Sequence, residues 1–259
     1  MKQDTPAGSA KGNFIFLLKN VQSDLYLFCD QDDVWTENHI EVLVNKYLSL
    51  PSDEKNIPIL IHSDMVVVNE KLEPISDSFF KYTRLPRYPG KRFYYLSNNV
   101  TGCVCLINDM LKHFVFRDPL LLESNMDKII MHDHFFSLIA VEFGKRYFLN
   151  EKTNYYRQHT NNELGAGQKF LLLDKISKIL IRKQKQSMLK ENNIEFEKNK
   201  VMLSFFLSYF PSLIIKEREI MGRYVNIRKE NKVWRMLFVI KNGILRFNFF
   251  RDVLFLYMI

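Results

Sequence analysis

A short acidic segment near the start of the chain has the residue types needed to hold a metal ion. Residues 25–35 read L-Y-L-F-C-D-Q-D-D-V-W, in which Asp30, Asp32 and Asp33 directly follow an apolar run. Aspartates separated by one residue can direct their carboxylates to one side of a loop, and Mg²⁺ and Mn²⁺ prefer oxygen ligands of this kind. The alternative is an Asp-rich turn with a helix cap, and Asp33 by itself is compatible with that alternative.

A calcium-binding EF-hand loop is excluded by the residues that follow. Counted from Asp30, positions 3 and 12 are Asp32 and Glu41, as such a loop requires. Position 5 is Val34, however, and position 6 is Trp35, where the loop needs glycine. The element that enters the segment is also a predicted strand rather than a helix.

Further candidates for acid–base or ligand chemistry occur later in the chain. Asp133 lies in M-H-D-H between His132 and His134. A carboxylate there can act as a general base, although an aspartate early in a helix is also stabilised by the helix dipole alone. The others, each with a structural alternative, are Asp64 in I-H-S-D (sheet-edge support or a cap), Gly102 in T-G-C (open backbone beside a site or a strand bulge), and Arg157 and His159 in Y-R-Q-H (phosphate and metal contacts or solvated surface groups).

Strands alternating with helices must position these residues. The predicted strands cover residues 25–29, 59–68, 99–107 and 147–156, and the predicted helices cover residues 13–20, a segment capped by Thr36, a segment beginning at Asp109, and residues 126–143 up to Gly144. Residues 74–92 are predicted to form a long loop. This alternation indicates an α/β fold, in which ligands bind beyond the carboxyl ends of strands.

Composition and charge narrow the class of protein. The 259 residues are 47% hydrophobic and 14% aromatic, which excludes intrinsic disorder. The first residues lack the apolar region of a signal peptide, and no run of 18 or more apolar residues is free of charge. The three cysteines, Cys29, Cys103 and Cys105, are too few for a zinc site or a disulfide framework and are expected to be buried, reduced thiols. These features predict a cytoplasmic protein.

Several motifs, taken in order, resemble bacterial family-2 glycosyltransferases, especially the rhamnosyltransferase-like branch. They are G-S-A-K-G-N-F, D-Q-D-D-V-W, I-H-S-D, N-N-V-T-G-C, M-H-D-H-F-F and Y-R-Q-H-T-N-N-E-L-G-A, which together span residues 8–167. The resemblance implies a GT-A fold, which is a Rossmann-like nucleotide-diphospho-sugar transferase fold. It implies a catalytic domain at residues 1–167 and a bound Mg²⁺ or Mn²⁺.

The resemblance also implies roles for individual residues. Asp133 would be the catalytic base, and a divalent cation would be bound by Asp32, Asp30 and His159. The nucleotide-sugar donor would be contacted by Gln31, Asp33, Asp64 and Arg157. The acceptor would be contacted by Gly102, His132 and His134. Relatives often have tryptophan where His134 and Phe135 stand, so the wall of the acceptor site is expected to differ.

The sequence departs from the family in its N-terminal half. A complete member begins with a strand, a short turn, a helix and an acidic segment that together hold the nucleotide, and none of these precedes Gly8. The resemblance therefore predicts an N-terminally truncated GT-A fold with little or no transferase activity in this polypeptide alone.

The C-terminal third has a different chemistry. Residues 1–167 have a net charge of −3, whereas residues 168–259 have a net charge of +11 and are expected to form basic amphipathic helices. Such a helical extension is predicted to lie on an anionic membrane surface, at the inner face of the cell membrane, or to pack on the catalytic core. No motif for nucleic-acid binding accompanies the charge.

The function that the resemblance implies is inverting transfer of a sugar from a nucleotide-diphosphate sugar to a cell-surface polysaccharide or lipid-linked acceptor, and the family favours rhamnose as that sugar. Two alternatives remain open at the level of sequence. One is a metal-dependent phosphohydrolase, since aspartate clusters and His–Asp pairs also serve hydrolytic metal sites. The other is a non-catalytic remnant that binds a membrane surface.

Overall fold

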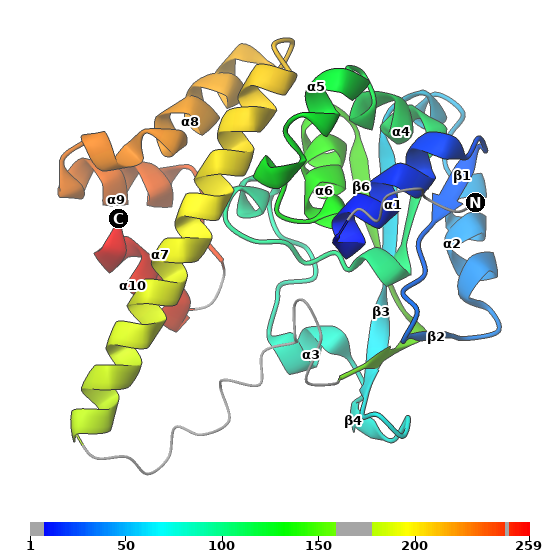
Figure 1. Cartoon of the computed structure of the whole chain (residues 1–259), viewed down its shortest axis with the longest axis horizontal. Helices are drawn as coiled ribbons and strands as arrows, with labels where there is room; N and C mark the ends of the chain where they lie inside the picture. The colour runs from blue at the N-terminus through cyan, green and yellow to red at the C-terminus, as the bar shows by residue number, and fades with distance from the viewer. Residues whose placement is uncertain (1–7, 159–177, 247–248) are drawn as a thin grey trace. The chain divides into compact units, whose positions relative to one another are not determined.

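The computed structural model describes residues 8–158, 178–246 and 249–259, and the chain divides into two compact units (Figure 1). The first unit comprises Met1–Phe79 and Asn98–Arg157, and the second comprises Phe80–Ser97 and Gln158–Ile259. The predicted domain boundary between residues 167 and 168 lies outside the described residues. Residues 80–97, which follow the first part of the sheet in sequence, group with the C-terminal helices.

The first unit is built on a mixed sheet. Its order is β1-β5-β3-β6-β2, with β4 paired to β3 beside this path. β3 and β6 run parallel, and the other pairs are antiparallel. The strands are β1 (Leu25–Leu27), β2 (Val34–Trp35), β3 (Ile59–Val68), β4 (Pro74–Ser76), β5 (Cys105–Asn108) and β6 (Lys145–Arg157). With the helices of this unit, the sheet gives the α/β architecture that the sequence predicts.

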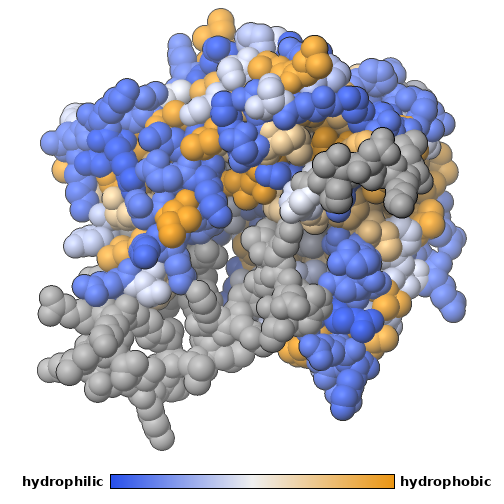
Figure 2. Space-filling view, viewed as in Figure 1, coloured by the Kyte–Doolittle hydropathy of each residue, from blue (hydrophilic) through white to orange (hydrophobic). Residues whose placement is uncertain are grey.

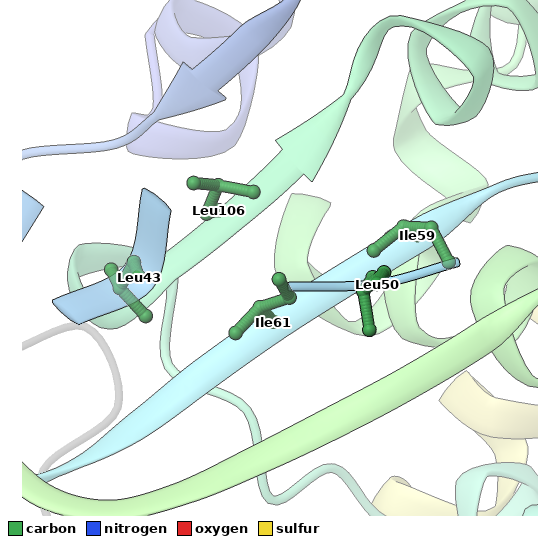
Figure 3. Close-up of a cluster of buried hydrophobic side chains, with 5 residues drawn as sticks. All are labelled: Leu43, Leu50, Ile59, Ile61 and Leu106. Carbon is green, nitrogen blue, oxygen red and sulfur yellow. The ribbon is translucent and has the colours of Figure 1, made fainter. Parts of the chain in front are cut away.

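Helix α2 (His39–Leu48) covers one face of the sheet. Alternate residues of a strand point to opposite faces, so Ile59 and Ile61 of β3 share a face. They form a buried cluster with Leu106 of β5, Leu43 of α2 and Leu50 just after α2 (Figure 3). Each of these side chains is at most 6% exposed, so the apolar run of β3 is explained by burial on both of its faces.

The remaining helices of this unit include α6 (His132–Phe143), which contacts both β3 and β6 and is buried over most of its length. It ends at Gly144, where an added Cβ atom would lie 1.8 Å from the carbonyl oxygen of Pro58. Only glycine allows this close approach of two backbone segments. The other helices and 3₁₀ turns are α1 (Ala10–Asn20), α4 (Asp109–Val115), α5 (Pro119–Glu123), η1 (Glu54–Asn56), η3 (Gly102–Val104) and η4 (Met126–Lys128), and α3 (Phe79–Thr83) begins at the last residue of the unit's first segment.

The second unit is helical in its described residues. Helix α7 (Lys178–Tyr209) contacts α8 (Ile215–Val225) and α10 (Phe249–Met258), and the remaining elements are η2 (Lys91–Tyr95), η6 (Ile227–Lys229) and α9 (Lys232–Lys241). Its core contains the buried rings of Phe196, Phe206, Phe210, Tyr224 and Phe255. Glu217 of α8 accepts hydrogen bonds from Arg92 Nε at 3.1 Å and Nη2 at 2.9 Å, which joins residues 80–97 to the C-terminal helices.

Several predicted elements have different limits in the structure. Thr36 does not cap the next helix, because α2 begins at His39 after Asn38, and the Thr36 hydroxyl donates to the carbonyl of Thr153. The strand predicted at residues 99–107 is shorter, since residues 102–104 form η3. The helix predicted from residue 126 begins only at residue 132, after η4. The loop predicted at residues 74–92 contains β4 and α3.

Two further findings concern membranes and thiols. Among the described residues, no helix combines the length and the apolar character needed to cross a bilayer.

Cys103 and Cys105 are buried, as predicted, but the prediction was wrong for Cys29, which is exposed. β1 ends at Leu27, so Cys29 lies in the loop after the strand, where it is open to solvent.

Candidate functional site

The acidic segment forms a loop that joins the two edges of the sheet. It leaves β1 at one edge and enters β2 at the other, so residues 28–33 pass the strands that lie between. Arg157, at the end of β6, holds this loop: its backbone N–H donates to Asp33 Oδ1 at 2.9 Å, and its Nε donates to the carbonyl of Asp32 at 2.9 Å. The loop is therefore fixed to the sheet on the side opposite to β1.

Asp30, Asp33 and Cys103 form the acidic cluster of this loop. Their potential ligand atoms all lie within 4.8 Å of one another. The buried Asn154 of β6 donates from Nδ2 to Asp33 Oδ2 at 3.2 Å and to the sulfur of Cys103 at 3.4 Å. Burial raises the pKa of Asp33, while hydrogen bonds from Cys103, Arg157 and Asn154 act in the opposite direction.

Two of the three potential ligands in this cluster are carboxylate groups. Burial raises the pKa of the Cys103 thiol well above its usual value, and the charges of Asp33 and Asp30 add to this effect. The oxygen donors of the cluster are two half-buried carboxylates, with Asp32 in the same loop. That donor set fits Mg²⁺ or Mn²⁺, which take a few carboxylates and complete their coordination with water and phosphate oxygens.

Trp35 has a structural part in this arrangement. Its Nε1 donates to the carbonyl of Cys103 at 3.1 Å, and its ring stacks on His39 with centroids 4.2 Å apart. Trp35 thus connects the end of the acidic loop to η3, where Cys103 lies.

Asp133, at the start of α6, is a buried carboxyl group with an unusual pKa. Burial raises its pKa from 3.8 to about 7, and the charge of Asp30 acts in the same direction. The backbone N–H groups of His134 and Gly102 and the side chain of Asn98 donate to the carboxylate and oppose part of this shift, the Gly102 bond measuring 3.1 Å. The effect of Asp30 indicates that Asp133 and the acidic loop act on each other electrostatically.

Cys105, the first residue of β5, is a buried thiol whose pKa is affected by both groups. Burial raises the pKa of its thiol, and the charges of both Asp133 and Asp30 raise it further. The pKa of the Cys105 thiol is therefore affected by charges in both the acidic loop and the start of α6.

Gly102 and His132 pack closely beside Asp133. A Cβ atom added to Gly102 would lie 2.6 Å from His132 Nε2, so the imidazole ring occupies the space that a side chain would need. The ring is also packed against Phe14, Phe28 and Phe136, with centroids 4.6 to 5.7 Å away. Burial lowers the pKa of His132 to about 4, so the ring is neutral at physiological pH.

Two residues predicted to contact the donor are bonded to the chain itself. The buried Asp64 accepts hydrogen bonds from the Met65 backbone at 2.8 Å, the Phe79 backbone at 3.0 Å and the Ser78 hydroxyl at 2.6 Å. These bonds fix the segment that leads into α3. Arg157 donates to backbone carbonyls, as described above, and also to the carbonyl of Glu70 at 3.0 Å.

The structure thus groups Asp30, Asp33, Asp133, Gly102 and His132, with Arg157 supporting the loop. Gln31 is exposed on the loop, and His134 is buried in α6. His159 lies outside the described residues. The roles predicted for all of these residues stay predictions.

Sequence reasoning missed three residues of the site: Cys103 as a member of the acidic cluster, Asn154 as its amide donor, and Asn98 beside Asp133. Cys103 was recognised only as a buried thiol. Asn154 lies in T-N-Y-Y, and a buried asparagine inside an otherwise strand-like run is a signal that could have drawn attention to it. In comparisons with known proteins, no family model, curated sequence or solved structure matches this chain.

Proposed function

We propose that this chain carries the catalytic site of an inverting glycosyltransferase with a GT-A-like sheet. The donor would be a nucleotide-diphosphate sugar, and the acceptor would be a hydroxyl group of a saccharide or lipid-linked saccharide. The observation that carries the proposal is the position of the buried Asp133 carboxyl beside an acidic loop whose Asp30 raises its pKa. A base and a cation site are the two groups that such a transfer needs.

Asp133 is assigned as the general base. The acceptor oxygen attacks the anomeric carbon of the donor sugar while the bond from that carbon to the phosphate oxygen breaks. The proton of the acceptor hydroxyl passes to the Asp133 carboxylate. A base is most effective when its pKa is near the working pH, and the pKa of Asp133, about 7, meets this requirement. The N–H groups of Gly102 and His134 hold the carboxylate in place.

The acidic loop is assigned to the donor diphosphate. Asp30, Asp32 and Asp33 would hold Mg²⁺ or Mn²⁺, which when bound neutralises charge on the departing nucleoside diphosphate. Gln31, exposed on the same loop, would donate hydrogen bonds to the sugar or phosphates. Arg157 and Asp64 support this function by fixing the loop and the segment before α3. His159 is proposed as a further cation ligand on the resemblance alone.

Titration calorimetry on the full chain tests the cation site first. We expect Mn²⁺ to bind, and UDP or dTDP to bind more tightly in its presence. The substitutions Asp30→Asn and Asp32→Asn should each weaken Mn²⁺ binding by about tenfold or more. Asp24→Asn is the matched control, because Asp24 is an exposed aspartate just before β1 and should leave binding unchanged.

Turnover assays then separate the possible chemistries. The truncated fold expected from the sequence implies little transfer by this chain alone, so the assay measures residual transfer from a nucleotide-sugar. A residual rate that falls by about 10²- to 10⁴-fold in Asp133→Asn, with Mn²⁺ and nucleotide binding retained, supports the proposal. Release of phosphate from phosphate esters would instead identify a metal-dependent phosphohydrolase. If neither Mn²⁺ nor nucleotide binds, the glycosyltransferase proposal is wrong, and a non-catalytic role is the better interpretation.

A further inference from the structure

Helix α9 exposes an apolar face instead of burying it. The exposed fractions are 63% for Val233, 62% for Trp234, 51% for Leu237 and 51% for Ile240. Residues three, four and seven positions apart lie on one side of a helix, so these four side chains share the outer face of α9. We call them the α9 apolar face.

The inner side of the same helix already has its own apolar contacts. Phe238 and Val239 are buried, and the guanidinium group of Arg223 lies over the Phe238 ring at 4.4 Å. Packing of α9 on its unit therefore does not require the four outer residues. An exposed tryptophan among aliphatic neighbours is unusual on a helix that has no outside partner, because each such side chain loses favourable burial.

The segment that contains the α9 apolar face is basic. Residues 214–246 contain nine lysines and arginines against three glutamates, a net charge of +6. Two of the glutamates are already paired within the unit, Glu217 with Arg92 and Glu230 with Arg223. Lys241 lies on the same side of α9 as Trp234 and Leu237, and it is exposed. The α9 apolar face therefore belongs to a basic segment and has an exposed lysine on the same side of the helix.

Helix α10 also exposes apolar side chains. It exposes Val253 at 49% and Tyr257 at 59%. Lys232 of α9 donates to the carbonyl of Tyr257 at 3.0 Å, and its ammonium lies 4.6 Å from the centre of that ring. The two helices are thus joined. Figure 2 shows hydrophobic patches among hydrophilic surface over the C-terminal helices.

We propose that the α9 apolar face docks on the surface of an anionic lipid bilayer. Trp234, Leu237 and Ile240 would enter the boundary between headgroups and acyl chains, while Lys241 and its basic neighbours contact anionic headgroups. An exposed apolar face with basic flanks is the pattern of helices that lie in this boundary, and tryptophan favours the same depth. The positive charge of residues 214–246 favours an anionic lipid surface over an uncharged protein partner. The inference does not depend on the proposed glycosyl transfer.

Co-sedimentation with vesicles tests the proposal on the full chain. Vesicles of phosphatidylcholine with about 30% phosphatidylserine should bind the chain at low salt, and pure phosphatidylcholine vesicles should bind it much less. Binding should fall in high salt, because screening weakens attraction to anionic lipid. Lys241→Gln should lower the partition coefficient by about fivefold, the loss expected for one basic residue near such a surface.

The decisive variant is Trp234→Ser with Leu237→Ser, and its matched control is Leu48→Ser with Leu120→Ser. All four residues are exposed, the control pair at 60% and 79%, so neither double variant should impair folding. We expect the α9 variant to lose binding by about tenfold or more while the control binds like the parent chain. Equal binding by both variants would overturn the proposal. It would also be overturned if anionic vesicles bind no better than neutral ones, or if sedimentation velocity shows that the α9 variant abolishes self-association instead.

Discussion

The raised pKa of Asp133 makes a quantitative prediction about stability. Its pKa is about 7 in the folded chain, against 3.8 for an ordinary aspartate. Between these values the folded state holds a proton that the unfolded state has lost, so stability falls as the pH rises, by about 1.4 kcal/mol for each pH unit. The full contribution is present below about pH 4 and is lost as the pH passes about 7, a total of about 4 kcal/mol.

The substitution Asp133→Asn removes this titration. An asparagine amide oxygen can still accept the hydrogen bond from the Gly102 N–H. We therefore expect the variant to gain stability relative to the parent chain by about 4 kcal/mol between pH 4 and pH 7.5. The reason is that the parent must ionise a buried carboxyl group over this range and the variant does not.

Urea unfolding at closely spaced pH values measures this difference directly. Other groups also titrate, but they titrate in both proteins, so the difference between the two free energies of unfolding isolates Asp133. Asp127→Asn is the matched control, since Asp127 is an exposed aspartate shortly before α6. A difference for Asp133→Asn that is constant from pH 4 to pH 7.5 would refute the reasoning.

Further substitutions test the packing around the site. Gly144→Ala should destabilise the chain by about 2 kcal/mol or more, since its Cβ would lie 1.8 Å from the Pro58 carbonyl, whereas Gly90→Ala has open space and should change stability by less than about 0.5 kcal/mol in thermal unfolding. Burial lowers the pKa of His132 to about 4, so the parent loses stability as the pH falls below about 6.5. The free energy of unfolding of His132→Leu minus that of the parent should therefore be about 2 kcal/mol larger at pH 5 than at pH 8 in urea titrations. A difference that does not change with pH would show that the ring is not buried and neutral. Glu217→Gln should cost about 1.5–3 kcal/mol, because Arg92 loses a charged partner, and an unchanged midpoint would contradict this.

The sequence was sufficient to predict those elements that are determined by the local pattern of apolar residues. The run at residues 59–68 corresponds to β3, and the α/β class is confirmed. The predicted ends of elements were wrong where a tertiary contact determines them. Thr36 has the residue type of a helix cap, but its hydroxyl bonds to Thr153 on β6, a partner 117 positions away that no local pattern reveals.

The site was predictable in its parts but not in its grouping. Asp30, Asp33 and Asp133 are chemically conspicuous, and the sequence identified all of them. Asn154 joins them because β2 pairs with β6 at the edge of the sheet, which brings its amide to Asp33. Cys103 joins them from η3, which Trp35 contacts through a hydrogen bond to the Cys103 carbonyl. Strand order of this kind depends on long-range pairing, which the spacing of residues along the chain does not determine.

The cost of ionising Asp133 supports the proposal that this region is a site rather than a part of the core. A carboxyl group that costs about 4 kcal/mol when ionised removes a large part of the 5–15 kcal/mol that stabilises a typical domain. A neutral residue at the start of α6 would avoid this cost, and the nearby charge of Asp30 increases it. The hydrogen bonds from Gly102 and His134 stabilise the ionised form without removing the cost. Groups arranged against stability in this way are concentrated at functional sites, and here the two groups concerned are those that a base and a cation-binding loop require.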